Sequence, residues 1–420
     1  MPDLLKLTSM CNRAAVPVID QPQLIYVLTE LVPGKAISNV RLPLNFSLVL
    51  DHSGSMAGEK LRTMKEAVNH IIDQLGEEDI ISIVTFQSRT EILAPAQPAR
   101  DKEALKRAVN KIRDGGGTNV APALQAGLRL VSQSLSPERV SRIILLTDGE
   151  ATDREEDSRR IADEAGSSGV PIIGLGLGQE WKEDFLFDLA DRSIQVASGS
   201  RLGMADYIPT PQDADRIFNE VYQSMQVVAQ DVTVNLRMVQ GLEARQVWQV
   251  APLIRHLGKD VIQGRTIHVQ TGQLEKSGIA YLAEIMLPPR PEGAVRIAQA
   301  DLTFQAPEQG LQRQSADLVV QYSNDPAQYN QMVGRVMNVV EKVQAFRLQT
   351  QALDDAQVGD VTNATRKLRQ AVTILLSQGE TELAGQMQQE ADRLEASGQV
   401  SSEGKKTIML TSRKTVKLSE

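Results

Sequence analysis

The stretch FSLVLDHSGSMAGEKL (residues 46–61) decides how the first large domain is expected to fold. Its apolar run, 46–50, stops at Asp51, and the loop that follows carries mainly small or hydroxyl-bearing side chains. A strand that is apolar on both faces is typical of the centre of a parallel sheet covered by helices. We therefore expect Asp51 at the carboxyl end of a buried strand, the edge where open α/β sheets bind ligands.

Similar apolar runs recur downstream, in DIISIVTF (79–86), RIILLTDG (142–149) and VPIIGLGLG (170–178). Amphipathic segments of helical length separate them. Alternating strands and helices imply right-handed crossovers, so the sequence predicts an α/β fold with a doubly wound, mainly parallel sheet. The expected helices lie near 60–75, 101–113, 121–134, 154–168 and 213–229.

The hydrophobic period changes to two between residues 231 and 322. In DVTVNLRMV (231–239) and IAYLAEIML (279–287) alternate residues are apolar, which places them on one face of a strand. Glycine and proline punctuate these runs, so we expect an antiparallel β-sandwich. The segment QLIYVLTEL (23–31) is also predicted to be a strand, and it has no α/β partner, so it is expected to pair into the sandwich.

A helical period returns between residues 326 and 398. Asp360 is expected to cap one helix, and Gly379 and Gly398 to bound another. These helices are predicted to pack on one another or on the sandwich. The apolar stripes are Val333, Val336, Val340 and Val343, then Val361, Leu368 and Leu375, then Leu383, Met387 and Leu394.

The polar and basic end of the chain is expected to be a solvated tail. An alternative is a segment used for phosphorylation or docking, with hydroxyls at Ser401, Ser402, Thr407, Thr411, Ser412 and Thr415. Whether TIMLT (407–411) adds a strand is left undecided by the sequence. The expected parts are a mobile arm at 1–15, sandwich strands at 16–43, the α/β domain at 44–228, the sandwich at 229–324, helices at 325–399 and the tail at 400–420.

Composition narrows the class of protein. The formal net charge of -8 disfavours general binding to nucleic acid, which needs a clustered positive surface. The single cysteine, Cys11, excludes an intrachain disulfide and gives no support for a thiolate metal cluster. The start, MPDLLKLTSMCNRAAV, lacks a signal-peptide pattern, and the chain has no apolar run of about 18 residues. These features predict a cytoplasmic protein without a transmembrane segment.

Asp51, Ser53 and Ser55 alternate along the loop, so one carboxylate and two hydroxyls can turn toward one point. Hard oxygen ligands with some positions left to water or a partner are what a small cation such as Mg²⁺ requires. Two other predicted strand-to-helix loops supply similar groups: Thr118 in DGGGTNVAPAL and Asp148 in LLTDGEATD. Because these loops belong to one sheet, we expect the five side chains to form one metal site.

The Asp51–His52–Ser53–Gly54–Ser55 pattern, with Thr118 and with Asp148 in TDG, resembles the metal ion-dependent adhesion site of von Willebrand factor type A (VWA) domains. All five positions of that motif are filled. The resemblance covers about residues 44–225 and implies a Rossmann-like domain. More loosely, the flanking β regions are similar to those of bacterial proteins in which a VWA domain is embedded in a β-sandwich, an arrangement related to that of inter-alpha-trypsin inhibitor heavy chains.

The resemblance implies a divalent cation held by Asp51, Ser53, Ser55, Thr118 and Asp148, with a Glu or Asp of a partner protein completing its coordination. Mg²⁺ is the expected ion, and Mn²⁺ and Ca²⁺ remain open. Partners of the kinds used by related bacterial proteins include AAA+ ATPases, signalling proteins such as kinases, and membrane assemblies. The expected function is thus a non-enzymatic, metal-dependent interaction module. The alternative is a metal-assisted phosphoester hydrolase using the same cation.

Other motifs carry less weight. His52 occupies a position that is not a ligand in the family, so it is expected beside the site or at the surface. Gly174, Gly176 and Gly178 follow a strand, but their G-x-G-x-G spacing departs from a dinucleotide fingerprint. The chain offers no G-x-S-x-G for a serine hydrolase and no H-x-x-x-H for a zinc protease. The acidic residues of TDREEDSRR (152–160) are expected to cap a helix N-terminus and interact with its dipole rather than to bind calcium.

Overall fold

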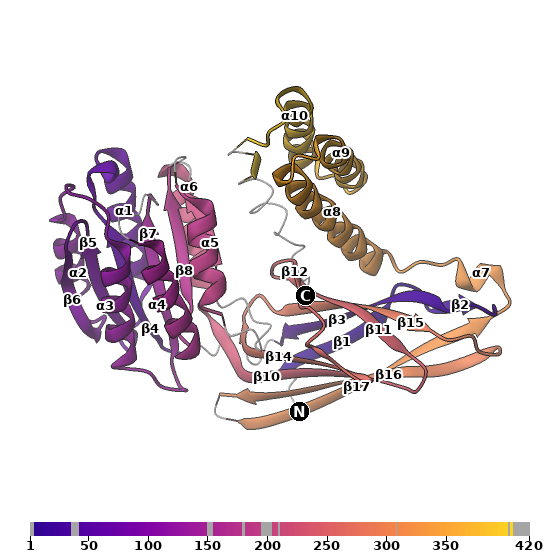
Figure 1. Cartoon of the computed structure of the whole chain (residues 1–420). Helices are drawn as coiled ribbons and strands as arrows, with labels where there is room; N and C mark the ends of the chain where they lie inside the picture. The colour runs from indigo at the N-terminus through magenta and orange to yellow at the C-terminus, as the bar shows by residue number, and fades with distance from the viewer. Residues whose placement is uncertain are drawn as a thin grey trace. The chain divides into compact units, whose positions relative to one another are not determined.

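The computed structural model describes residues 4–34, 42–148, 154–178, 181–194, 204–208, 211–307, 309–401 and 404–405. The chain forms two compact units (Figure 1). One is Asn39–Val228, and the other combines Met1–Ser38 with Ala229–Glu420. The second unit is thus built from both ends of the chain, with the first unit inserted between them.

The unit Asn39–Val228 is the predicted doubly wound α/β domain. Its six-stranded sheet has the order β6-β5-β4-β7-β8-β9. The strands pair in parallel except β6, which lies antiparallel at one edge. The strands are β4 (Leu44–Asp51), β5 (Ile80–Phe86), β6 (Thr90–Pro98), β7 (Val140–Thr147), β8 (Ile172–Leu177) and β9 (Met204–Ile208).

Helices cover both faces of this sheet because its central strands are buried on both sides. Phe46, Leu48 and Leu50 face a core shared with α1, α2 and α6. On the opposite face Val49 lies against Gly127 of α3, which packs on α4, as α4 does on α5. The helices are η1 (Gly54–Met56), α1 (Glu59–Gln74), α2 (Lys102–Asn110), α3 (Val120–Ser132), α4 (Glu155–Ser167), α5 (Glu183–Arg192) and α6 (Pro211–Ser224).

Helix α5 and strand β9 were not predicted, and two further details of this domain differ from the sequence prediction. The helix expected at 213–229 ends at Ser224, and strand β10 begins at Val227, where the β-branched pair Val227 and Val228 favours a strand. Strand β6 was not expected because it contains two prolines, which an edge strand tolerates since one row of its N–H groups has no partner. None of these differences alters the predicted fold class.

The second unit contains the predicted sandwich. Its sheets have the orders β1-β3-β15-β11-β12 and β13-β14-β10-β16-β17-β2. The buried hydroxyls of Tyr281 in β15 and Thr271 in β14 bond across them at 2.7 Å. The strands are β1 (Leu5–Cys11), β2 (Ala15–Pro17), β3 (Gln23–Pro33), β10 (Val227–Met238), β11 (Glu243–Ala251), β12 (Arg255–His256), β13 (Ile262–Gln263), β14 (Thr266–Glu275), β15 (Ile279–Leu287), β16 (Gly293–Ala306) and β17 (Gly310–Ser323).

The N-terminal segments belong to the sandwich. Strand β3 lies between β1 and β15 and pairs antiparallel with both. The prediction of a mobile arm at 1–15 is wrong for the described residues, because Leu5–Cys11 forms β1 and Cys11 is buried. Strand β1 lies at a sheet edge, so only its ends Leu5 and Cys11 are buried and its apolar pattern is weak.

The C-terminal helices divide between the two predicted packing modes. Val336, Val340 and Val343 pack on the sandwich, in a cluster with Leu28 and Trp248. The apolar residues of the second and third stripes pack on each other. The Asp360 carboxylate accepts the Asn363 N–H at 3.1 Å, which confirms the predicted helix cap. These helices are α7 (Pro326–Tyr329), α8 (Gly334–Gln357), α9 (Val361–Ser377) and α10 (Thr381–Ser397).

Of the hydroxyls predicted in the tail, Ser401 is described, and its Oγ donates to Glu390 at 2.8 Å. The others, and TIMLT, lie outside the described residues. No helix in the described ranges is long and apolar enough to cross a membrane.

Candidate metal centre in the inserted domain

Asp51 ends the central strand β4 and is fully buried. Its Oδ1 accepts the Ser53 N–H at 2.8 Å, and its Oδ2 accepts the Thr147 hydroxyl at 2.6 Å. Burial raises the pKa of the Asp51 carboxyl, the bonds from Thr147 and Ser53 lower it, and the charge of Asp148 raises it. A buried carboxylate beside a second one is an environment that a cation stabilises.

The loop after Asp51 continues this chain of oxygens. The Oγ atoms of Ser53 and Ser55 lie 3.1 Å apart, and the Ser55 hydroxyl donates to Asp148 Oδ1 at 3.0 Å. The short helix η1 carries the loop, and its Met56 side chain is buried in the core of the domain. The hydrogen-bonded row therefore runs from Thr147 through Asp51 and the two serines to Asp148.

The glycine-rich loop 115–118 lies against this row. The Gly54 N–H donates to the Gly116 carbonyl at 3.0 Å, and the Gly115 N–H donates to the His52 carbonyl at 2.9 Å. Thr118 is the last residue of this loop and is buried near the amino end of α3. The loops that carry the five predicted residues thus meet at the carboxyl edge of the sheet, with direct side-chain bonds joining Ser53 to Ser55 and Ser55 to Asp148.

The donor set suits a small divalent cation. It supplies two carboxylates and three hydroxyls, all hard oxygens, which leaves coordination positions for water or an external ligand. No group of three or more His, Cys, Asp or Glu side chains gathers at a metal-binding spacing among the described residues. His52 Nδ1 lies 2.7 Å from the Arg113 carbonyl, a contact that ties the loop to residue 113.

Two residues at the site were missed from the sequence. Thr147 holds Asp51, as described above, and Lys60 Nζ lies 3.0 Å from Asp148 Oδ2. Thr147 stands beside Asp148 in TDG, which was a usable signal. Lys60 gave no such signal, because a lysine in the first turn of a surface helix is ordinarily solvated.

The glycines of G-x-G-x-G serve packing rather than a nucleotide. A Cβ on Gly174 would lie 3.3 Å from Leu186, and one on Gly176 would lie 2.5 Å from the Trp181 ring. The acids that begin α4 likewise bond within the protein, as Glu155 does with Arg159 at 2.9 Å. These contacts agree with the structural interpretation of both motifs.

Gly58 is the N-cap of α1 and joins this helix to the loop that carries Ser53 and Ser55. Its φ of 78° and ψ of -120° suit glycine, and no atom lies within 4 Å of an added Cβ. We expect Gly58→Ala to lower the free energy of unfolding by about 1–3 kcal/mol through backbone strain alone. Urea denaturation would measure it. Gly385→Ala, in the exposed helix position of α10, is the control and should stabilise slightly; equal effects of both would contradict the strain at Gly58.

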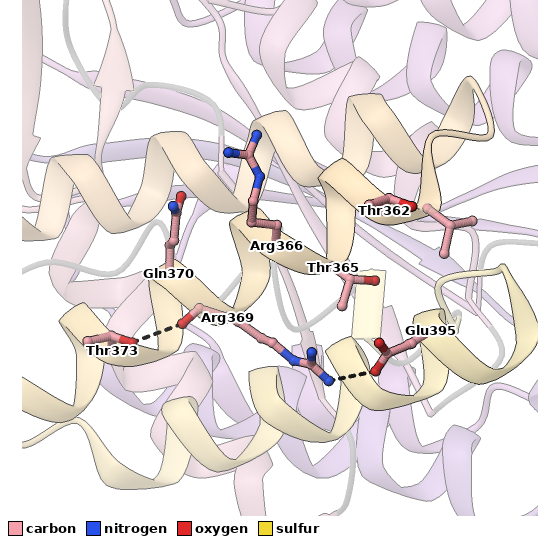
Figure 2. A pocket seen from close by; sticks show the side chains of 8 residues that line it. Thr362, Thr365, Arg366, Arg369, Gln370, Thr373 and Glu395 are labelled. Carbon is pink, nitrogen blue, oxygen red and sulfur yellow. Dashed lines mark hydrogen bonds and ion pairs between the residues drawn. The ribbon is translucent and has the colours of Figure 1, made fainter.

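A polar cavity of about 590 Å³ lies along α9 and α10, in the other unit. Figure 2 shows Arg369 reaching toward Glu395, which it meets at 2.6 Å, while Arg366 points away from that pair. Arg369 also pairs with Asp392 at 3.3 Å. Because its guanidinium is already neutralised by two carboxylates, this cavity is a weaker candidate than the loop cluster around Asp51.

The fold is an α/β domain inserted in the sequence between the parts of a sandwich, with a cluster of oxygen-bearing side chains at the carboxyl edge of its sheet. Residues 45–200 match the von Willebrand factor type A domain, and residues 334–418 match the Sll0103-like, C-terminal alpha-helical domain. The chain therefore contains a VWA domain, which confirms the resemblance seen in the sequence, and a C-terminal segment that matches the Sll0103-like helical domain.

Two curated relatives illustrate the similarity in sequence. An uncharacterized protein, sll0103, of Synechocystis sp. is 34% identical over 186 residues, 44% of this chain and 42% of that protein. The inter-alpha-trypsin inhibitor heavy chain H3 of Rattus norvegicus is 32% identical over 161 residues, 36% of this chain and 18% of that protein. The chain thus spans less than half the length of these curated relatives.

A solved structure, the von Willebrand factor type A protein from Catenulispora acidiphila, aligns with 98% of this chain and 97% of its own, at a TM-score of 0.74 and 20% identity. This similarity shows the fold alone. It covers the sandwich and the helices as well as the VWA domain, so folds of all three kinds recur in another protein.

Proposed function

We propose that the chain is a metal-dependent protein-binding module. Asp51, Ser53, Ser55, Thr118 and Asp148 hold a divalent cation, Mg²⁺ in the first instance, and a Glu or Asp of a partner protein completes its coordination. The supporting observation is the hydrogen-bonded row from Asp51 through the serines to Asp148 at the carboxyl edge of the sheet. The matched VWA domain adds the expectation that this edge binds protein.

The geometry explains why the partner group would be acidic. With two carboxylates, Asp51 and Asp148, among five ligands, the cation keeps positive character. An incoming carboxylate then gains a charge-assisted bond in a partly desolvated site. When bound, the cation supplies this attraction, and the chain's own residues fix where the partner group arrives.

The test is a capture experiment with the immobilised full chain. Wild type in Mg²⁺, wild type in EDTA, and Asp51→Ala in Mg²⁺ are compared, and return of Mg²⁺ to the EDTA-treated bait is the control. We expect one or more proteins to be retained in Mg²⁺ and released by EDTA, and to be absent with Asp51→Ala. Identical captures in all conditions would contradict a metal-gated interaction.

Catalysis is not part of the proposal. A phosphoester hydrolase would place a general base beside the cation, and the acids at the row described above are Asp51 and Asp148, both assigned to the metal. Turnover of generic phosphoesters by the wild type that disappears in Asp148→Ala would favour the hydrolase instead.

A further inference from the structure

Lys60 occupies an unusual place for a cation. It is the second residue of α1 (Glu59–Gln74), where the positive end of the helix dipole disfavours a positive side chain. Its ammonium nevertheless turns toward the metal-site loops and lies 3.0 Å from Asp148 Oδ2, with the side chain 28% exposed. The attraction of Asp148 therefore outweighs the unfavourable position on the helix.

A second loop makes room for the same side chain. Gly178 follows strand β8 with φ of 78°, and a Cβ there would lie 3.1 Å from Lys60 Cε and 3.9 Å from Cδ. Any larger residue at 178 would crowd the lysine stem. The third glycine of G-x-G-x-G thus lets Lys60 lie along the end of β8 on its way to Asp148.

Asp148 is divided between two partners. Its Oδ1 accepts the Ser55 hydroxyl, and its Oδ2 receives the Lys60 ammonium. A divalent cation that binds among Asp51, Ser55 and Asp148 brings two positive charges close to Nζ, and like charges at such separations repel strongly at the partial burial seen here. The cation and the ammonium therefore compete for one carboxylate.

We propose that Lys60 is a tethered cation that neutralises Asp148 in the metal-free protein and is displaced when the divalent ion binds. This inference rests on the proposed function and adds a determinant of metal affinity. Lys60 stabilises the metal-free domain and weakens binding of the metal, so half-filling of the site needs a higher concentration of free divalent ion.

The test measures Mg²⁺ and Mn²⁺ binding by titration calorimetry and the melting temperature in EDTA, on the full chain. We expect Lys60→Met to bind each ion about tenfold more tightly, since a competing charge is gone, and to melt lower than wild type in EDTA. Lys60→Gln is the second variant, in case the methionine impairs folding. Arg62→Met removes a charge from the same helix turn, but from a side chain that is 63% exposed, and should leave both quantities unchanged.

The outcomes separate the two proposals. If wild type binds the ions and both Lys60 variants bind them equally or more weakly, the competition is overturned while the metal site stands. If wild type binds neither ion, the proposed function fails, and the competition fails with it. If Arg62→Met tightens binding as much as Lys60→Met, general surface charge explains the effect and Lys60 has no specific role.

Discussion

Replacing Asp51 by asparagine should lower the affinity for divalent cations by on the order of 100-fold or more. Loss of a group that merely supports a metal ligand costs about 10–100-fold, so loss of a direct anionic ligand should cost at least the upper end of that range. Asparagine keeps an oxygen to accept the Ser53 N–H, which holds the loop, but it removes the charge and puts an amide NH₂ where Oδ2 accepted the Thr147 hydroxyl. Titration calorimetry with Mg²⁺ and Mn²⁺ measures the change.

Asp79→Asn is the matched control. Asp79 is also fully buried in the same domain, but it accepts the Leu44 and Gly76 N–H groups at 2.8 Å and 2.7 Å, at the opposite end of β4. We expect this variant to lose stability and to bind metal as wild type does. Unchanged metal affinity in Asp51→Asn would show that Asp51 is not a ligand.

The fold class could be predicted because a central strand that is buried on both faces appears in the sequence as a continuous apolar run. The run before Asp51 is the simplest case: all of Leu44–Asp51 is buried. The edge strands β1 and β6 were missed for the converse reason, since an edge strand buries less and its apolar pattern weakens. Helix α5 was not predicted. Its Leu186 packs against Gly174, and Trp181, just before the helix, packs against Gly176, so the two glycines were a sign that a bulky segment covers β8.

The sequence predicted those side chains of the candidate site that lie at the carboxyl ends of parallel strands. Asp51 and Asp148 share an edge because β4 and β7 pair in parallel, with Leu50 beside Leu146. Contacts between side chains far apart in sequence were harder to predict. Thr147 reaches Asp51 across 96 positions, and its place beside Asp148 in TDG was the one signal for it. Lys60 reaches Asp148 across 88 positions, and a lysine in the first turn of a helix gives no sign of such a bond.

Thr147→Val should weaken both the fold and the metal site. Valine has nearly the shape of threonine, so packing at the end of β7 is kept while Asp51 Oδ2 loses the 2.6 Å bond from the hydroxyl. A buried acceptor left without this donor costs about 1–3 kcal/mol of unfolding free energy. The same carboxylate is then held less firmly, and metal affinity should fall by about 10–100-fold. Urea denaturation in EDTA and calorimetric titration measure the two effects separately.

Thr147→Ser distinguishes the hydroxyl from the methyl group. Serine keeps the Oγ donor and deletes only the methyl group, so we expect metal affinity close to wild type with a modest loss of stability from the missing carbon. Because Thr147 is fully buried beside Asp51, neither substitution changes the surface offered to a partner. Equal loss of metal affinity in the valine and serine variants would mean that packing, rather than the hydrogen bond to Asp51, positions the carboxylate.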